Sequence, residues 1–276
     1  MDIQRIAAFT NGSIGGNPAG VVLCNVLPPT DEMQRIATAV GFSETAFAAP
    51  IGDSWRVRYF APEMEVPFCG HATVALGAAL ASQHGDGIYP LLLNHAAISV
   101  EGKTDGVLVS ATLQSPETNS KPAPTKLVND ALDLFSLSAQ DLDQRIPPAL
   151  ANAGENHLVL ALGTHECLKR MYYDFAKGKQ LMLNNGLCTI TLLYVENDQL
   201  IHARNPFASG GVYEDAATGA AAAALAGYLR DIDWPHRGHI DIQQGDDMGM
   251  PSRIGVDISP IPGASIRVSG TVRFMN

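Results

Sequence analysis

Cysteine and charged residues are scarce in this chain of 276 residues. The four cysteines, Cys24, Cys69, Cys167 and Cys188, are widely spaced and form no C-x-x-C pair, which is too few for a disulfide framework or a structural zinc site. Reduced thiols in a cytoplasmic protein are therefore predicted. Charged residues make up 17% and hydrophobic residues 46% of the chain, a balance that excludes global disorder and allows a large core.

Long apolar runs and an excess of basic residues are also missing. The most apolar stretches, 73–81 and 220–229, are much shorter than the roughly 18–20 residues that span a bilayer. Residues 1–9 alternate like a strand and lack the basic and apolar regions of an export signal. With 18 Lys and Arg against 28 Asp and Glu, the net charge of −10 repels phosphate backbones and anionic lipids. We expect neither a nucleic acid nor a membrane partner.

Sequence motifs for common cofactors are absent as well. The chain contains no Walker loop, no G-x-G-x-x-G and no H-E-x-x-H. No nucleotide, metal or other cofactor is therefore predicted.

Alternation of polar and apolar residues predicts many short strands and few helices. Helices are predicted at 31–40, capped by Thr30, at 70–82 and 218–230, both rich in alanine, and at 166–176, which is amphipathic. This mixture indicates an α+β fold. Strands are predicted at 3–9, 20–23, 44–49, 55–60, 97–101, 107–112, 157–161, 189–195, 199–203, 239–243, 255–258 and 265–274.

A proline- and serine-rich stretch, Gln114–Thr125, has the composition of a connection between domains. The two sides resemble each other, because Cys69-Gly70 aligns with Thr218-Gly219 at an offset of 218 − 69 = 149 residues. We predict a duplicated unit with domains at 1–114 and 115–264; a chance match between two alanine-rich helices is the competing explanation. Two helix N-termini facing each other across a cleft favour a carboxylate ligand or a developing oxyanion.

Several short motifs follow one another along nearly the whole chain. Together, in this order, they are highly specific. They are Phe9-Thr10, Gly16-Asn17-Pro18-Ala19-Gly20-Val21, Ser43-Glu44-Thr45-Ala46-Phe47, Arg58-Tyr59-Phe60-Ala61-Pro62, Phe68-Cys69-Gly70-His71-Ala72-Thr73, Glu214-Asp215-Ala216-Ala217-Thr218-Gly219, Gln244-Gly245 and Pro251-Ser252.

These motifs resemble those of the PhzF family of phenazine-biosynthesis isomerase-like proteins, which are similar in fold to diaminopimelate epimerase. The resemblance implies an α+β fold of two similar domains, each a mostly antiparallel sheet wrapped around a central helix like a hotdog half barrel. The strand at 265–276 would complete the first domain, and the active site would lie in the interdomain cleft. The resemblance also implies a homodimer and a small-molecule carboxylate substrate.

Glu44 is the main candidate for catalysis. Its apolar neighbours Phe42, Ala46 and Phe47 would raise the pKa of the carboxyl group by desolvation and suit it to proton transfer. A solvated carboxylate at a strand edge is the simpler alternative from the residues alone. The resemblance favours catalysis, because the family's general acid/base glutamate lies in the matching Ser-Glu-Thr motif.

His71 and Asp215 stand beside the starts of the two alanine-rich helices. A neutral His71 imidazole could hydrogen-bond a substrate there, since the helix dipole disfavours its protonated form. Asp215 has the spacing of a helix cap, which by itself accounts for its position. The resemblance implies that both residues are catalytic, and that Asn17, Ser43, Gly70, Thr218 and Gly219 bind the substrate. For the two glycines, close helix packing is the alternative to ligand binding.

Cys69 offers a different chemistry. Relatives such as diaminopimelate epimerase have a catalytic cysteine in each half, but the second-half counterpart here is Thr218, so two-thiol racemisation is not supported. A one-base reaction stays open, because a helix N-terminus would lower the pKa of the thiol; a structural buried cysteine is the alternative. A Cys69–His71 hydrolase dyad is disfavoured, since residues two apart on a helix point to different sides.

Three residues depart from the usual family pattern. Ala216 and Ala220 stand where proline and serine are common, and Met250 stands where arginine is common. These changes put the dihydro-hydroxyanthranilate substrate of phenazine synthesis in doubt.

The prediction from sequence is thus a cofactor-independent isomerase of a small carboxylate-bearing metabolite. The alternatives are a Cys69-dependent epimerase or dehydratase of an amino or imino acid, and a non-catalytic binding or scaffold protein.

Overall fold

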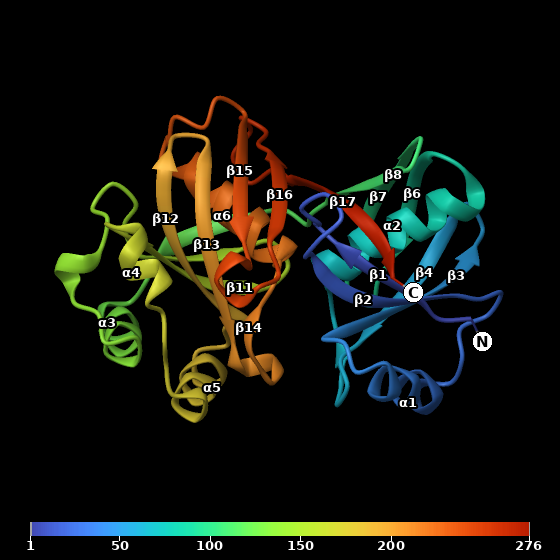
Figure 1. Ribbon diagram of the computed structural model, residues 1–276, viewed down its shortest axis with the longest axis horizontal. Helices are drawn as coiled ribbons and strands as arrows, with labels where there is room; N and C mark the ends of the chain where they lie inside the picture. Colours follow the sequence, from blue (N-terminus) through green and yellow to red (C-terminus); the bar gives the residue numbers. More distant parts are fainter. Residues whose placement is uncertain (1, 276) are drawn as a thin grey trace.

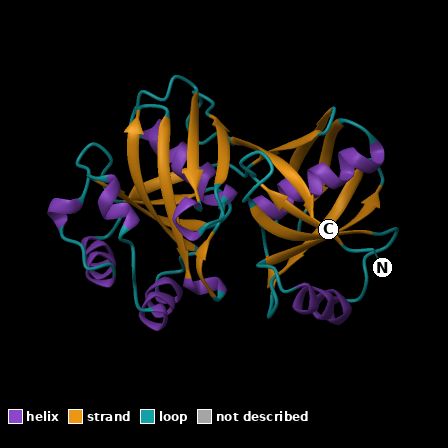
Figure 2. Cartoon of the chain, in the orientation of Figure 1, coloured by secondary structure: helices purple, strands orange, loops and turns teal. Residues whose placement is uncertain are grey.

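The computed structural model describes residues 2–275 and has the expected α+β composition, with strands and a smaller number of helices (Figures 1 and 2). All named strands join one 17-stranded hydrogen-bonded network that is strongly curved. Two long helices, α2 (Gly70–His84) and α6 (Gly219–Asp231), lie inside the curves, and residues 70–81 and 219–230 are buried throughout. A helix buried on every side has to be apolar all round, which explains the alanine-rich sequences. Within residues 2–275, no helix is long and apolar enough to cross a bilayer.

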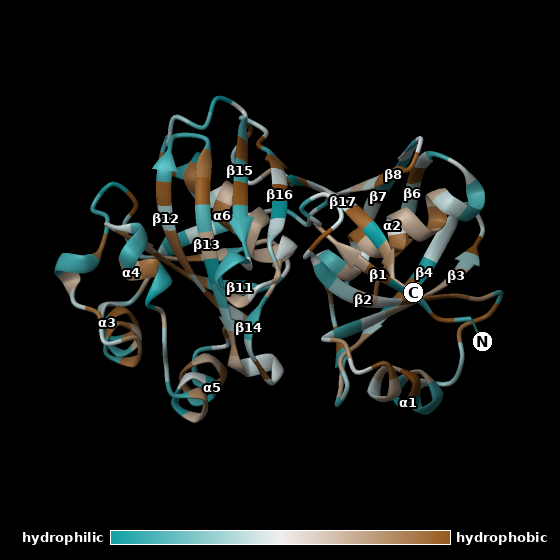
Figure 3. Ribbon diagram, viewed as in Figure 1, coloured by the Kyte–Doolittle hydropathy of each residue, from teal (hydrophilic) through white to brown (hydrophobic). Residues whose placement is uncertain are grey.

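The first group of strands surrounds α2. Strands β2 and β3 run parallel, as do β4 and β6, and the other pairings in this group are antiparallel. Helix α1 (Thr30–Val40) packs outside the group, and Figure 3 shows it with both hydrophobic and hydrophilic residues. The strands are β1 (Gln4–Ala8), β2 (Asn17–Leu23), β3 (Glu44–Ile51), β4 (Ser54–Phe60), β5 (Glu65–Val66), β6 (Gly87–Leu92), β7 (Ala97–Asp105) and β8 (Leu108–Gln114).

The second group surrounds α6 and repeats this connectivity. Its parallel pairs, β11 with β12 and β13 with β15, occupy the same places in the order as those of the first group. Helices α3 (Thr125–Leu134), α4 (His165–Lys169) and α5 (Phe175–Asn184) lie on its outside (Figure 1). The strands are β9 (Asn119–Pro122), β10 (Ala149–Asn152), β11 (Asn156–Leu162), β12 (Thr189–Asn197), β13 (Leu200–Phe207), β14 (Val212–Asp215), β15 (His239–Gln244) and β16 (Ser252–Asp257).

The C-terminal strand β17 (Arg267–Met275) links the two groups. Its residues 267–269 pair with β16 on one side, residues 267–272 pair with β8, and residues 272–275 pair with β1. In Figure 1 this strand passes from one group to the other and ends beside β1.

The stretch Gln114–Thr125 runs from the end of β8 in the first group to the second group, where its residues 119–122 form β9 and pair with β10. Two expectations about local structure were wrong. Helix α1 is preceded by Pro29, and Thr30 instead accepts a hydrogen bond from Arg58.

The second is the single helix predicted at 166–176, which is two helices. Tyr173 lies between them and is buried, with its ring stacked on Tyr213 at 4.4 Å between centroids. The backbone N–H of Tyr173 donates to the hydroxyl of Tyr213 (2.8 Å), and Asp174 then caps the next helix by accepting from the N–H of Lys177. The contacts of Tyr173 with Tyr213, which is distant in the sequence, therefore interrupt the helix.

Candidate active site

The starts of helices α2 and α6 touch at Gly70 and Gly219. A Cβ atom on Gly70 would lie 2.8 Å from the backbone nitrogen of Ala220, and a Cβ on Gly219 would lie 3.3 Å from the Cα of Gly70. These two glycines are therefore closely packed, as the alternative explanation predicted. Both helix N-termini, with their unpaired N–H groups and positive dipole ends, meet at this point.

Glu44 lies beside the start of α2. It is the first residue of β3, and it shares a face with Ala46 and Ala48, which pack in the core around α2. Its side chain is buried, and its Oε2 atom lies 3.4 Å from the Nε2 atom of His71. The Ser43 hydroxyl is 3.3 Å from the same nitrogen. The solvated strand-edge carboxylate considered from sequence is wrong.

The environment of Glu44 raises the pKa of its carboxyl group. Burial raises the pKa of the carboxyl group, and the charge of Asp215 raises it further. Hydrogen bonds from Ser43 and Cys69 oppose these effects, and the resulting pKa is about 7. A carboxyl group with this pKa is matched to proton transfer near neutral pH.

His71 is a neutral imidazole in this site. It is only 3% exposed, and burial lowers its pKa to about 3. Its Nδ1 atom lies 3.3 Å from the Sγ atom of Cys69. The expectation that Cys69 and His71 point apart was wrong, because Cys69 precedes the helix in an extended conformation (φ −146°, ψ 116°) and is not on a helical turn.

Cys69 does not carry the activated thiol expected at a helix N-terminus. Burial and the charges of Glu44 and Asp215 raise its pKa well above the ordinary value, although a backbone hydrogen bond opposes them. The desolvation of the thiolate therefore outweighs the helix dipole. The thiol stays protonated at neutral pH.

Asp215 is held by hydrogen bonds from two predicted site residues, Asn17 and Thr218. Its Oδ1 accepts from the Nδ2 of Asn17 and its Oδ2 from the hydroxyl of Thr218, each at 2.7 Å. Burial raises its pKa to about 6, although these hydrogen bonds lower it. The helix-capping interpretation was wrong, since Thr218 precedes α6 and no side chain caps that helix.

Gln244 belongs to this site too; the sequence analysis placed it in a motif but assigned it no role. Its Nε2 donates to the backbone oxygen of Asp215 (2.8 Å), and its Oε1 accepts from the N–H of Thr218 (3.2 Å). It ends strand β15 and is buried. The Gln244-Gly245 motif was the sequence signal for this residue, but its burial and its contact with Asp215 were not visible in the sequence.

A second polar cluster was also missed. Thr189 begins β12 just as Glu44 begins β3, so it is the counterpart of Glu44 in the repeated connectivity. Its hydroxyl lies 2.8 Å from the Nδ1 of His157 and donates to the Oδ1 of Asn205 (3.2 Å). Burial lowers the pKa of His157 to about 3. The second half therefore has a neutral network at the position where the first half has a carboxyl group.

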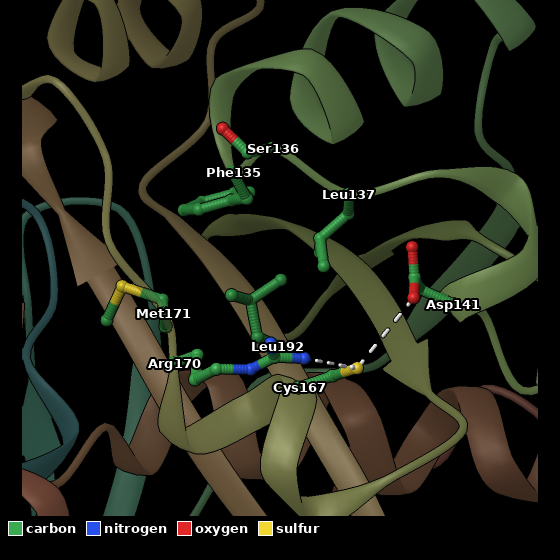
Figure 4. A pocket seen from close by; sticks show the side chains of 8 residues that line it. All are labelled: Phe135, Ser136, Leu137, Asp141, Cys167, Arg170, Met171 and Leu192. Atoms are coloured by element: carbon green, nitrogen blue, oxygen red, sulfur yellow. Dashed lines mark hydrogen bonds between the residues drawn. The ribbon is translucent and has the colours of Figure 1, made fainter.

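Cys167 lies away from these residues. It lines a pocket of about 240 Å³. Its Sγ atom is 3.8 Å from the Oδ1 atom of Asp141 and 3.9 Å from the Nη2 atom of Arg170. Figure 4 marks both contacts with dashed lines. None of the predicted site residues lines this pocket. Glu44, His71 and Asp215 are each 6% exposed or less, so the site is closed in this conformation.

The arrangement brings a carboxyl group with a pKa near neutrality, a neutral imidazole and a second carboxyl group to the junction of two helix N-termini. It can remove and return a proton, and the helix ends can stabilise negative charge. Three of its side chains, Glu44, Cys69 and His71, also place possible metal-ligand atoms within 4.8 Å of one another.

Comparison with known proteins identifies the family. The family model of phenazine biosynthesis-like proteins (PhzC-PhzF) matches residues 6–274. The chain belongs to this phenazine biosynthesis-like family. The resemblance seen in the motifs is thereby confirmed.

Relatives similar over nearly their whole length are named as isomerases. The chain is 31% identical to an uncharacterized isomerase of Mesorhizobium japonicum, with 95% of this chain and 92% of the relative covered. It is 27% identical to the uncharacterized isomerase YfhB of Bacillus subtilis, with 99% and 96% covered. This PhzC-PhzF family member is accordingly an isomerase.

Solved structures agree with the fold. A predicted epimerase from Pseudomonas aeruginosa superimposes with a TM-score of 0.86 and 25% identity, covering 99% of this chain and 96% of that one. A hydroxyproline epimerase from Agrobacterium vitis shares the fold at a TM-score of 0.65 and 11% identity, with 99% and 89% covered.

Proposed function

We propose that this PhzF-like isomerase is cofactor-independent and moves a proton between carbons of a small carboxylate-bearing metabolite, with Glu44 as the general acid/base. The observation that carries the proposal is the buried Glu44 carboxyl group, whose pKa is about 7 and which lies 3.4 Å from a neutral His71. Its lone pair is available to a substrate, because the buried Oε2 atom has no hydrogen-bond partner within residues 2–275.

The reaction begins when the Glu44 carboxylate takes a proton from a substrate carbon. The electron pair of that C–H bond passes into the conjugated system and forms an enolate-like anion, while Glu44 becomes a carboxylic acid. Backbone N–H groups at the starts of α2 and α6, near Gly70 and Gly219, stabilise the anion. Glu44 then returns its proton to a different carbon, so the double bond moves and no atom is gained or lost.

The remaining residues orient the substrate. His71, as a neutral imidazole, and Asp215, held by Asn17 and Thr218, bind polar groups of the substrate beside the base. Ser43 contacts His71 and keeps its ring in place. No lysine or arginine side chain within residues 2–275 hydrogen-bonds to Glu44, His71 or Asp215. The substrate carboxylate therefore binds at the positive N-terminal ends of the two helices.

We also propose that the two groups of strands are two domains, residues 1–114 completed by 265–276, and residues 115–264. The pairing of β17 with β1 and β8 supports this division. The site would lie in the cleft between the domains, and because it is closed here, the domains would open to admit substrate and close to exclude water. A cytoplasmic homodimer is proposed as well, and the four free cysteines support the reducing compartment.

A Cys69-dependent epimerase is the second candidate, favoured by the position of the thiol 3.3 Å from His71 and by the epimerase among the structural neighbours. The raised thiol pKa and the threonine at position 218 in place of a second cysteine argue against it.

Proton NMR in D₂O tests these assignments. The purified protein is incubated with dihydro-hydroxyanthranilate and a panel of conjugated, amino and hydroxy acids, beside Glu44→Gln and Cys69→Ser. A displaced double bond or deuterium uptake that depends on Glu44 supports the isomerase. Exchange at an α-carbon that depends on Cys69 supports the epimerase instead, and binding of an acid without exchange by any form supports a binding protein.

A further inference from the structure

Glu44, Cys69 and His71 bring three different donor types together in a buried space. A carboxylate oxygen, a thiol sulfur and a ring nitrogen lie within 4.8 Å of one another, and each residue is 6% exposed or less. They come from two elements, the start of β3 and the start of α2. Within residues 2–275 this is the one group of three such residues that meets the spacing of a metal site.

One of the three donor atoms lacks a partner. The Oε2 atom of Glu44 is buried and accepts no hydrogen bond within residues 2–275, and it lies 3.4 Å from the Nε2 atom of His71. A buried acceptor without a partner is unfavourable, because it has lost its hydrogen bonds to water and gained none in the protein. The oxygen is therefore set to receive a cation or a donor that enters the site.

The donor types and spacings suit zinc. Tetrahedral zinc with bonds of about 2.0–2.3 Å places neighbouring donor atoms about 3.3–3.6 Å apart. The Nε2–Oε2 distance of 3.4 Å lies in this range, and the Sγ–Nε2 distance of 4.0 Å comes into it with a shift of a few tenths of an ångström. Magnesium and calcium need about six or more oxygen ligands, which this site does not offer.

The charges also balance. When the metal binds, the Cys69 thiol releases its proton and a sulfur–metal bond forms, so thiolate and Glu44 carboxylate together neutralise a divalent cation. Asp215 is close enough to raise the pKa of Glu44, and its negative charge offsets the positive ends of the two helices. Three protein ligands leave a fourth position open.

We propose that Glu44, Cys69 and His71 form a binding site for Zn²⁺, and that bound zinc inhibits the isomerase by occupying the lone pair with which Glu44 accepts the substrate proton. The binding site rests on the geometry alone, whereas the inhibition rests on the proposed function. Zinc is thus an inhibitor that competes with the substrate, and the metal-free protein is the active form.

Cobalt titration of the full chain tests the site without any substrate. Co²⁺ reports tetrahedral coordination by its visible absorption and a sulfur ligand by a near-ultraviolet charge-transfer band, and Zn²⁺ should then displace it with one site per chain. Cys69→Ser should remove the sulfur band and weaken Zn²⁺ binding at least about tenfold, the lower limit for losing even an outer-shell partner. Cys167→Ser is the matched control, because Cys167 lies outside the site. This variant should change neither the sulfur band nor the affinity for Zn²⁺.

The same spectra distinguish the buried site from metal binding at the protein surface. The exposed pairs His202–Glu196 and His239–Asp257 offer nitrogen and oxygen donors only, so they give no sulfur band. A sulfur band that survives in Cys69→Ser, or the absence of any sulfur band in the wild type, would overturn the site. Thermal unfolding of each variant without metal shows whether it is folded.

Inhibition is measured separately, as loss of solvent deuterium exchange when Zn²⁺ is added and its recovery with a chelator. Exchange that continues with the site filled by zinc overturns the inhibition and leaves the acid/base function standing. A different result is also informative. If cobalt shows the sulfur-ligated site but the metal-free protein catalyses no exchange, the metal site stands and the proposed function is contradicted.

Discussion

His71 and Glu44 face each other across 3.4 Å in the closed site, yet they do not form an ion pair at neutral pH. Burial lowers the pKa of the imidazole to about 3 and raises that of the carboxyl group to about 7. The same low-dielectric environment thus discourages both charges. A base that is only half ionised at pH 7, beside a neutral hydrogen-bonding partner, is suited to taking and returning one proton.

Replacing Glu44 by glutamine should stabilise the fold at pH 8 and have a smaller effect at pH 5. The native carboxyl has a pKa of about 7, above the unfolded value of about 4.3, so the native state binds the extra proton between these values. The free energy of unfolding of the wild type therefore falls as pH rises through this range. At pH 8 the variant should be more stable by up to roughly 4 kcal/mol, at about 1.4 kcal/mol per pKa unit.

Urea unfolding at both pH values measures this difference, with Glu63→Gln as the control because Glu63 is exposed. An equal change in stability at pH 5 and pH 8 would mean that the Glu44 carboxyl is not shifted.

Asp215→Asn should lower the pKa of Glu44. The charge of Asp215 is the second cause, after burial, of the raised value, and asparagine removes it while retaining a similar shape. NMR titration of carboxyl-labelled glutamate side chains follows Glu44 directly and needs no substrate. Because the two carboxyl groups interact, the wild type should titrate over a broader range than the variant. An unchanged Glu44 titration contradicts the electrostatic account of the site.

Gly70→Ala should destabilise the protein by about 1–3 kcal/mol, the usual cost of overpacking. The new methyl group would lie 2.8 Å from the backbone nitrogen of Ala220, which cannot move without shifting α6. Gly87→Ala is the matched control, since no atom lies within 4 Å of its added Cβ. Chemical unfolding compares the two, and equal stabilities would show that the helix starts have room to separate.

Thr189→Val should cost about 1–3 kcal/mol, because it leaves the buried Nδ1 of His157 without a partner. The exposed Thr104→Val should change stability by no more than about 0.5 kcal/mol. Thermal unfolding of both variants checks the prediction. A Thr189→Val protein as stable as the Thr104 variant would show that the cluster does not contribute to folding.

The two central helices and most strands were predictable because their signals are local. Alanine-rich helices that begin at glycine, such as the one at Gly70, keep their pattern whatever surrounds them, and alternation marks strands such as β3. The break between α4 and α5 was not predictable, because the stacking of Tyr173 on Tyr213 joins residues 40 positions apart.

In the candidate site, too, residues in local motifs were predictable, whereas contacts that depend on the folded backbone were not. The motifs indicated Glu44, His71 and Asp215, and the structure places Glu44 beside His71 and joins Asp215 to Asn17. The contact between Cys69 and His71 depends on an extended backbone at Cys69, and the Thr189 cluster depends on pairing between strands. Neither leaves a pattern in the sequence.

The central claim is that Glu44 moves the proton, and the rate of deuterium uptake from D₂O into the substrate tests it most directly. Glu44→Gln should exchange at least about a hundredfold more slowly than wild type, the lower range for loss of a general acid/base. Cys69→Ser should retain exchange within about tenfold, because a protonated thiol takes no proton from carbon. Wild-type exchange in Glu44→Gln, together with its loss in Cys69→Ser, would contradict the account and assign the chemistry to the thiol.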